Sequence, residues 1–235
     1  MTKQEMILIQ EEMRALGFYA GGIDGIWGKQ SQDAFVLLTE HYRKSKVAEL
    51  GYNAKNVVTA VKQHIWGKKV GKDFVAAVTW IANAISLPDP EGEGTNNLLA
   101  CMAFESGETF SPSIKNGAGS GATGLIQFMP STARSLGTTT DKLAKMTQLE
   151  QLNYVYKYFA PHKGKLKNLG DIYMAILWPA GIGKADTWVL WDSKSRPTVY
   201  RQNAGLDVNK DGVITRGEAL KKIREKYEAG KKFMG

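Results

Sequence analysis

The stretch ACMAFESGETFSPSIKNGAGSGATGLIQFMPSTA, residues 100–133, decides the fold of this chain. It begins as an apolar run with helical spacing and reaches Glu105, Ser106 and Gly107. A loop rich in glycine and serine follows and leads into GLIQFMP at 124–130. A glutamate at the end of an apolar helix, directly before a polar loop, is a candidate functional residue.

Glu105 lies where the helical pattern calls for an apolar residue, and Asn96 or Asn97 is the predicted N-cap of this helix. One helix face is predicted to hold Glu105 together with Leu98, Cys101 and Met102. Burial disfavours the charged form of a carboxylic acid, so it raises the pKa. A glutamate that stays protonated near neutral pH can act as a general acid. The pattern leaves open the alternative of a solvated glutamate at a frayed helix end.

The residues around Glu105 resemble the catalytic core of the lysozyme-like soluble lytic transglycosylases and related phage endolysins. That family has a Glu-Ser pair after a buried helix, then a Gly-Ala-Gly pattern, Gly-Leu-Met-Gln, Met-Pro and Thr-Ala. This chain has the same order in Glu105-Ser106, GATGLIQ at 121–127, Met129-Pro130 and Thr132-Ala133, with Ile126 in place of methionine. The resemblance implies an all-α, mainly helical, lysozyme-like domain in which Glu105 is catalytic. It also implies that Ser106 and Gln127 bind substrate or orient Glu105.

The resemblance implies cleavage of the β-1,4 bond between N-acetylmuramic acid and N-acetylglucosamine in peptidoglycan. A lytic transglycosylase needs no second catalytic carboxylate, whereas a hydrolytic muramidase (lysozyme) uses one. Glu108 lies in the loop, and Glu150 and Asp171 are distant in sequence. We therefore predict a transglycosylase and keep the muramidase as the alternative.

Aromatic residues in helical runs between 141 and 191 are the further candidates for substrate binding, namely Tyr158, Tyr173 and Trp178. The segment MAILWPAG at 174–181 occupies the place of the family's Ala-Tyr-Asn-Ala-Gly motif. Here Trp178 stands for the tyrosine and Pro179 for the asparagine. For all three aromatic residues, packing in the core is the open alternative.

A second resemblance covers residues 4–44. LGF at 16–18, DGIWG at 24–28 and AF at 34–35 resemble the signature of a small three-helix peptidoglycan-binding module. It implies that Asp24 and Trp27 line a sugar or peptide groove, with a purely structural role as the alternative. We predict a peptidoglycan-binding domain at 1–45, a partly helical connecting segment at 46–70 and the lysozyme-like domain at 71–235.

The stretch DVNKDGVITRGE, residues 207–218, matches an EF-hand calcium loop at each diagnostic position. The predicted ligands are Asp207, Asn209, Asp211, Val213, Thr215 and Glu218. The helix after the loop is clear, whereas residues 196–200 before it are predicted to be extended or irregular. We predict a structural Ca²⁺ that the chemistry does not require; the alternative is a polar turn without an ion.

The formal net charge of +8 indicates an acidic partner, which on charge alone is a wall polymer, an anionic lipid or a nucleic acid. The basic residues are scattered without a recognition motif, so we expect no nucleic acid. The basic run at 220–233 is predicted either to touch anionic lipid or lipopolysaccharide weakly or to form a solvated helix. The single cysteine, Cys101, excludes an intramolecular disulfide.

The biological role expected from the resemblance is host cell lysis by a monomeric phage endolysin. No apolar run approaches the roughly 20 residues of a membrane span, and the N-terminus lacks the apolar core of a signal peptide. We expect synthesis in the host cytoplasm and action on the cell wall, in the periplasm, after release. A non-catalytic wall-binding or calcium-dependent adhesion protein is the rival, and the Glu105-Ser106 pair argues against it.

Overall fold

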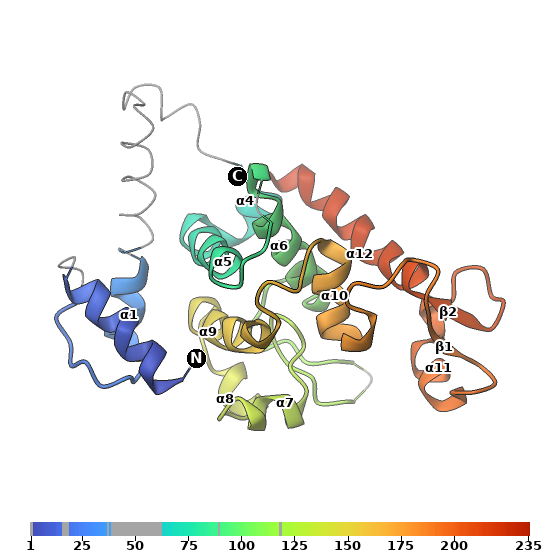
Figure 1. Ribbon diagram of the computed structural model, residues 1–235, viewed down its shortest axis with the longest axis horizontal. Coiled ribbons are helices and arrows are strands. Elements are labelled where there is room, and N and C mark those ends of the chain that lie inside the picture. The colour runs from blue at the N-terminus through green and yellow to red at the C-terminus, as the bar shows by residue number, and fades with distance from the viewer. Residues whose placement is uncertain (1, 16–18, 37, 39–62, 89, 118) are drawn as a thin grey trace.

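Helices make up most of the computed structural model, which describes residues 2–15, 19–36, 38, 63–88, 90–117 and 119–235 (Figure 1). The α-helices are α1 (Lys3–Ala15), α4 (Gly67–Val70), α5 (Lys72–Ala84), α6 (Glu93–Glu105), α7 (Pro130–Ser135), α8 (Thr140–Ala144), α9 (Gln148–Phe159), α10 (Leu169–Leu177), α11 (Pro197–Asn203) and α12 (Arg216–Gly230). Short 3₁₀ turns lie at Pro90–Gly92, Ala160–His162, Pro179–Gly181, Ala204–Leu206 and Lys231–Phe233. The strands β1 (Val189–Asp192) and β2 (Val213–Thr215) pair antiparallel. The predicted mainly helical, lysozyme-like fold class is confirmed.

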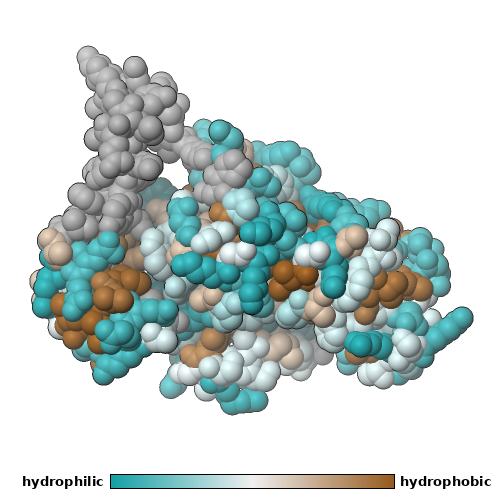
Figure 2. All heavy atoms as spheres, in the orientation of Figure 1, coloured by the Kyte–Doolittle hydropathy of each residue, from teal (hydrophilic) through white to brown (hydrophobic). Residues whose placement is uncertain are grey.

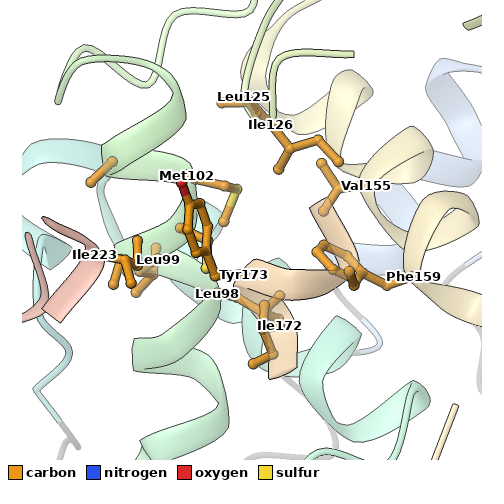
Figure 3. Packing of buried hydrophobic residues seen from close by; sticks show 14 of the residues in the cluster. Leu98, Leu99, Met102, Leu125, Ile126, Val155, Phe159, Ile172, Tyr173 and Ile223 are labelled. Carbon is orange, nitrogen blue, oxygen red and sulfur yellow. The ribbon is translucent and has the colours of Figure 1, made fainter. Parts of the chain in front are cut away.

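Helix α6 is the centre of the larger core, where it packs against α5, α10 and α12. All of its residues from Gly94 to Ala103 are buried, which is typical of a helix in a protein interior. Figure 3 shows this packing around Leu98, Leu99, Met102, Ile172, Tyr173 and Ile223. The sequence predicted that only one face of this helix is buried, whereas the structure buries all of its faces.

The predicted N-cap of this helix was also wrong, because α6 begins at Glu93 and both Asn96 and Asn97 are buried inside it. Asn96 has a structural role instead. Its Oδ1 accepts a hydrogen bond from the Ile65 amide at 3.2 Å and lies 3.0 Å from His64 Nδ1. A polar side chain inside α6 thus fixes the segment that precedes α4.

The two ends of the larger unit are joined to each other. The His64 amide donates to the Gly235 carbonyl at 3.0 Å, and the Gly235 amide donates back to His64 at 3.2 Å. Trp66 is fully buried and stacks on Phe233 at 5.0 Å. Residues from His64 onward therefore pack with the larger core. The remainder of the predicted connecting segment, 46–62, lies outside the described residues.

The N-terminal unit has a small core of its own, built from Met13, Tyr19, Ala34, Phe35 and Leu38. It contains α1 and a second helix through residues 29–36. The third helix that the resemblance implies is not tested by the described residues. Phe35 packs edge-on against Trp80 of α5 at 4.6 Å, and Trp80 contacts Tyr156 of α9 at 4.9 Å. These aromatic contacts dock the unit on α5 and α9.

The segment before the calcium-like loop is helical, so the prediction of an irregular stretch at 196–200 was wrong. Helix α11 begins at Pro197, and a proline fits the first helical position because its missing N–H would have no partner there. The β-branched and aromatic residues that follow it obscured this signal. Among the described residues, none of the helices combines the length and apolar character needed to cross a membrane.

Candidate active site

Glu105 is the last residue of α6, and its side chain is half-buried at the point where the buried helix meets the loop. Burial raises the pKa of Glu105 to about 8, and no charged neighbour contributes to this shift. Most Glu105 side chains therefore carry a proton at neutral pH. This is the state that a general acid requires before it protonates a leaving oxygen.

Two of the predicted aromatic residues lie near Glu105. Burial raises the pKa of Tyr158 to about 12 and raises the pKa of Tyr173 well above its usual value. The negative charge of Glu105 is the second cause of both shifts. The Tyr158 hydroxyl donates to the Ala175 carbonyl at 2.7 Å, which ties α9 to α10. Tyr173 is only 2% exposed and packs edge-on against Phe104 at 5.4 Å. The half-buried Tyr158 is thus better placed to contact a substrate.

Ser106 is completely buried, and its hydroxyl acts as both donor and acceptor of hydrogen bonds within the protein. The hydroxyl donates to the Met102 carbonyl at 2.6 Å and accepts from the Phe110 amide at 2.9 Å. This geometry gives no support to the predicted substrate contact. It makes Ser106 a residue that fixes the loop directly after Glu105.

Gln127 belongs to a loop that two backbone bridges hold, Lys115 with Thr123 and Thr123 with Phe128. Its Nε2 donates to the carbonyls of Gly124 at 3.1 Å and Ile114 at 3.3 Å. The amide group therefore stabilises the turn first. Among the described residues, its Oε1 has no hydrogen-bond partner and can accept one from a substrate hydroxyl.

Gln151 of α9 is a residue of the site that sequence reasoning missed. It is fully buried, accepts from the Leu125 amide at 2.6 Å and donates to the carbonyls of Pro112 at 2.9 Å and Leu143 at 3.0 Å. Gly124 has a positive φ of 86° and leaves no room for a Cβ beside Gln151. The available signal was an uncharged polar residue on the inward face of an otherwise apolar helix.

Trp178 lies in another cluster. Its ring packs edge-on against Trp191 of β1 at 5.6 Å, and the Arg196 guanidinium lies 5.5 Å from its centre. These contacts join the end of α10 to β1 and the start of α11, and they favour the alternative of a packing role.

The three carboxylates considered as a second catalytic group are each engaged elsewhere. Glu108 forms an ion pair with Lys226 of α12. Glu150 caps α9, since its Oε2 accepts from the Thr147 amide at 2.7 Å. Asp171 is buried against Arg216 at 3.0 Å. In the described part of the chain, the Glu105 carboxyl has no second carboxyl that shifts its pKa.

In the N-terminal unit, Asp24 and Trp27 lie on one turn but have different surroundings. Asp24 Oδ1 accepts from the Ile26 amide at 2.8 Å and from Gln10 Nε2 at 3.2 Å. These hydrogen bonds lower the pKa of Asp24, so the carboxylate is part of the turn. Trp27 packs edge-on against Phe35 at 5.5 Å, and another part of it lines an open groove.

The calcium-like loop has some features of a metal site and lacks others. Asp207 Oδ2 accepts from the Gly212 amide at 3.0 Å, while its Oδ1 is buried without a hydrogen-bond partner among the described residues. Gly212 has the positive φ of 83° that the sharp turn needs. Glu218, however, caps α12 through the Thr215 amide at 2.9 Å. No group of three or more acidic, histidine or cysteine side chains converges as for a metal among the residues described.

The basic C-terminal helix uses part of its charge inside the molecule. Arg224 pairs with Asp186 at 2.7 Å, Lys226 with Glu108, and Lys231 with Glu228 at 2.6 Å. Three exposed lysines remain, Lys221, Lys222 and Lys232.

Comparison with known families agrees with the geometry around Glu105. Residues 91–177 match the model of the transglycosylase SLT domain, whose members are lytic transglycosylases that cleave glycosidic bonds of peptidoglycan. The matched segment contains Glu105, the GLIQ loop, Tyr158 and Tyr173. This part of the chain is similar to lytic transglycosylase domains, and the predicted class of enzyme and its peptidoglycan substrate are confirmed. No curated protein matches the chain.

Proposed function

We propose that Glu105 is the sole acid and base of a lytic transglycosylase reaction. As acid, its carboxyl protonates the oxygen of the β-1,4 bond, which breaks from the muramyl C1. As base, the resulting carboxylate takes the proton of the muramyl 6-hydroxyl, whose oxygen bonds to C1 and closes a 1,6-anhydro ring. Glu105 regains its proton, and no water is consumed. The observation that supports this most is a carboxyl with a pKa of about 8 and no acidic partner.

A matched pair of variants tests this assignment. Glu105→Gln removes the transferable proton and keeps the shape, so we expect loss of murein cleavage by at least about a hundredfold. Glu108→Gln neutralises a neighbouring carboxylate that pairs with Lys226, and it should retain most of the activity. Equal activity of Glu105→Gln and the unmodified protein in clearing cell walls contradicts the proposal.

We further propose that the chain acts as a modular phage endolysin, in which residues 1–45 hold the wall and the larger domain cuts it. Support comes from the separate core of the N-terminal unit and from the half-buried Trp27 beside an open groove. In this proposal the enzyme is a monomer that is made in the host cytoplasm, acts on the wall after release and causes lysis. In this proposal, the exposed lysines Lys221, Lys222 and Lys232 contact anionic lipid or lipopolysaccharide.

A structural Ca²⁺ in the loop at 207–218 is also part of the proposal. The donor set is rich in oxygen, as Ca²⁺ prefers, and Asp207 has a buried oxygen without a partner. Asp207, Asn209, Asp211 and Glu218 would hold the ion with their side chains. The ion would secure the start of α12, which packs on the catalytic helix, and takes no part in the reaction.

A further inference from the structure

A groove of about 410 Å³ lies between the N-terminal unit and the helices α8 and α9. We name it the lysine groove, after the charged residues in its wall. The principal residues that line it are Trp27, Lys29, Lys142, Lys145, Tyr154 and Lys157. Neither part of the chain forms this groove alone, because the first two residues come from the N-terminal unit and the others from the larger domain.

The positive charge of the lysine groove is largely unbalanced. Lys29 pairs with Asp33 at 3.2 Å, whereas Lys142, Lys145 and Lys157 have no ion pair with any described residue. Glu150 also lines the groove, but its carboxylate caps α9. Unpaired cations around a concave surface attract and hold anionic groups.

Lys157 is the most constrained of these lysines. Its side chain is half-buried, its Nζ lies 4.9 Å from the centre of the Tyr154 ring, and desolvation lowers its pKa. An ammonium group that is partly withdrawn from water and has no carboxylate beside it is stabilised by an incoming anion. The aromatic faces of Tyr154 and Trp27 add apolar surface, which is typical of ligand sites.

The lysine groove and the catalytic site border the same helix, α9. Tyr154 in the groove and Tyr158 near Glu105 are four residues apart on α9, so about 6 Å of helix rise separates them. A saccharide at Glu105 and a branch of the same ligand in the groove would thus both lie beside α9.

We propose that the lysine groove binds the peptide stems of peptidoglycan, whose free carboxylates meet the ammonium groups of Lys142, Lys145 and Lys157. The proposal rests on the proposed function for its substrate. It assigns to this enzyme a preference for glycan strands that still carry their peptides. The N-terminal unit then contributes to the binding of substrate as well as to the binding of the wall.

The test measures binding with the full-length chain carrying Glu105→Gln, so that no cleavage occurs. The groove variant adds Lys142→Gln, Lys145→Gln and Lys157→Gln. The control variant adds Lys221→Gln, Lys222→Gln and Lys232→Gln, which change the net charge equally on exposed positions of the C-terminal region. The ligands are immobilised glycan strands with their peptide stems and the same strands after an amidase has removed them.

We expect the groove variant to bind stem-bearing strands about tenfold more weakly, with binding of stripped strands and both results for the control variant unchanged. Equal binding by the groove variant and its parent overturns the proposal. The proposal is also overturned if the groove variant loses as much affinity for stripped strands, or if the control variant loses as much affinity for stem-bearing strands. It is likewise overturned if the groove lysines contribute more to the binding of duplex DNA or anionic vesicles than to the binding of these strands. Cleavage by the chain with Glu105 intact is measured separately, so failure of the reaction is distinguishable from failure of the groove.

Discussion

Among the residues that the structure describes, no other carboxyl contributes to the pKa shift of Glu105. Glu108, Glu150 and Asp171 have an ammonium, a backbone amide and a guanidinium as partners, respectively. These three carboxylates are thus held by partners of their own, whereas burial of Glu105 stabilises its protonated form and raises its pKa. One acid with a raised pKa can serve in turn as acid and base, as an intramolecular ring closure requires.

The pH dependence of the rate follows from this single group. Because the acid must carry its proton, kcat/KM on soluble glycan chains should be constant around neutral pH and decline as the pH rises above about 8. A rate profile measured at constant ionic strength checks this. A decline that is already complete near pH 5 would mean that Glu105 has the pKa of an ordinary solvated glutamate.

Stability should also depend on the protonation of Glu105. Its pKa in the folded state, about 8, lies above the value of 4.5 expected for the unfolded chain. The folded state therefore binds this proton more tightly, and the stability contribution is present below pH 4.5 and lost as the pH rises through 8. At pH 9, we expect the free energy of unfolding of Glu105→Gln, measured by urea denaturation, to exceed that of the unmodified protein by roughly 2–4 kcal/mol. At pH 4, we expect little difference between the two. Equal stabilities at pH 9 contradict the raised pKa.

At the scale of elements, α9 holds the loop that follows Glu105 through side-chain hydrogen bonds. It provides Gln151 to the loop at Leu125 and Gln148 to the carbonyl of Phe110 at 2.7 Å. It also carries Tyr158 near Glu105 and Tyr154 in the lysine groove. A capping box at Thr147 and Glu150 fixes where this helix begins, and so fixes all of these positions.

Gln151→Leu should damage both stability and activity. The change removes the hydrogen bonds of Gln151 with the Leu125 amide and with the Pro112 and Leu143 carbonyls, and it leaves the Leu125 amide without this acceptor. We expect a loss of about 2–4 kcal/mol in the free energy of unfolding, together with reduced murein cleavage. Gln202→Leu, at an exposed position, is the control and should stay within about 0.5 kcal/mol. A stable and active Gln151→Leu variant would show that the loop does not need this residue.

Calcium should stabilise the protein through the loop before α12. At about a hundred times its dissociation constant, a ligand specific for the folded state adds about 2.7 kcal/mol. We expect Ca²⁺ to raise the melting temperature above that in a chelator by about 5–10 °C, and Asp207→Ala to remove the shift. An identical melting temperature with and without Ca²⁺ means that the loop is a polar turn.

The sequence predicted the elements with local signals and missed those that tertiary packing decides. The Gly-rich loop and the helix after residue 218 have local signals, whereas the predicted cap at Asn96 or Asn97 was wrong. The complete burial of α6 has no local signal, since its neighbours α5, α10 and α12 come from distant parts of the chain. The same applies to Ser106 and Gln151, whose roles depend on partners that only the fold brings near.

At the scale of the whole molecule, α12 connects the outer parts of the chain to the catalytic helix. Its residues pack along α6, Lys226 pairs with Glu108 just after Glu105, and the Lys226 carbonyl accepts from Trp66 Nε1 at 3.2 Å. The N-terminal unit docks on the opposite part of the domain, through Trp80 and Tyr156. Figure 2 shows apolar side chains on the exposed surface of that unit. Ile26 of the same unit is 67% exposed.

Sequence reasoning predicted the family that residues 91–177 match because the Glu105-Ser106 pair and the GLIQ loop are contiguous motifs. It could not place the N-terminal unit against α5 and α9, because the Phe35–Trp80 contact joins residues far apart in the chain. The sequence could not predict the lysine groove for the same reason. Its lysines are ordinary surface residues until the two units are assembled.

The most direct test of the central claim is mass spectrometry of the soluble products released from purified murein. A reaction that uses Glu105 alone as acid and base should release muropeptides that end in 1,6-anhydro-muramic acid. Products that end in reducing muramic acid, heavier by one water, would show hydrolysis. They would contradict the account, because hydrolysis calls for a second carboxylate beside the bond, and the three candidates are engaged elsewhere.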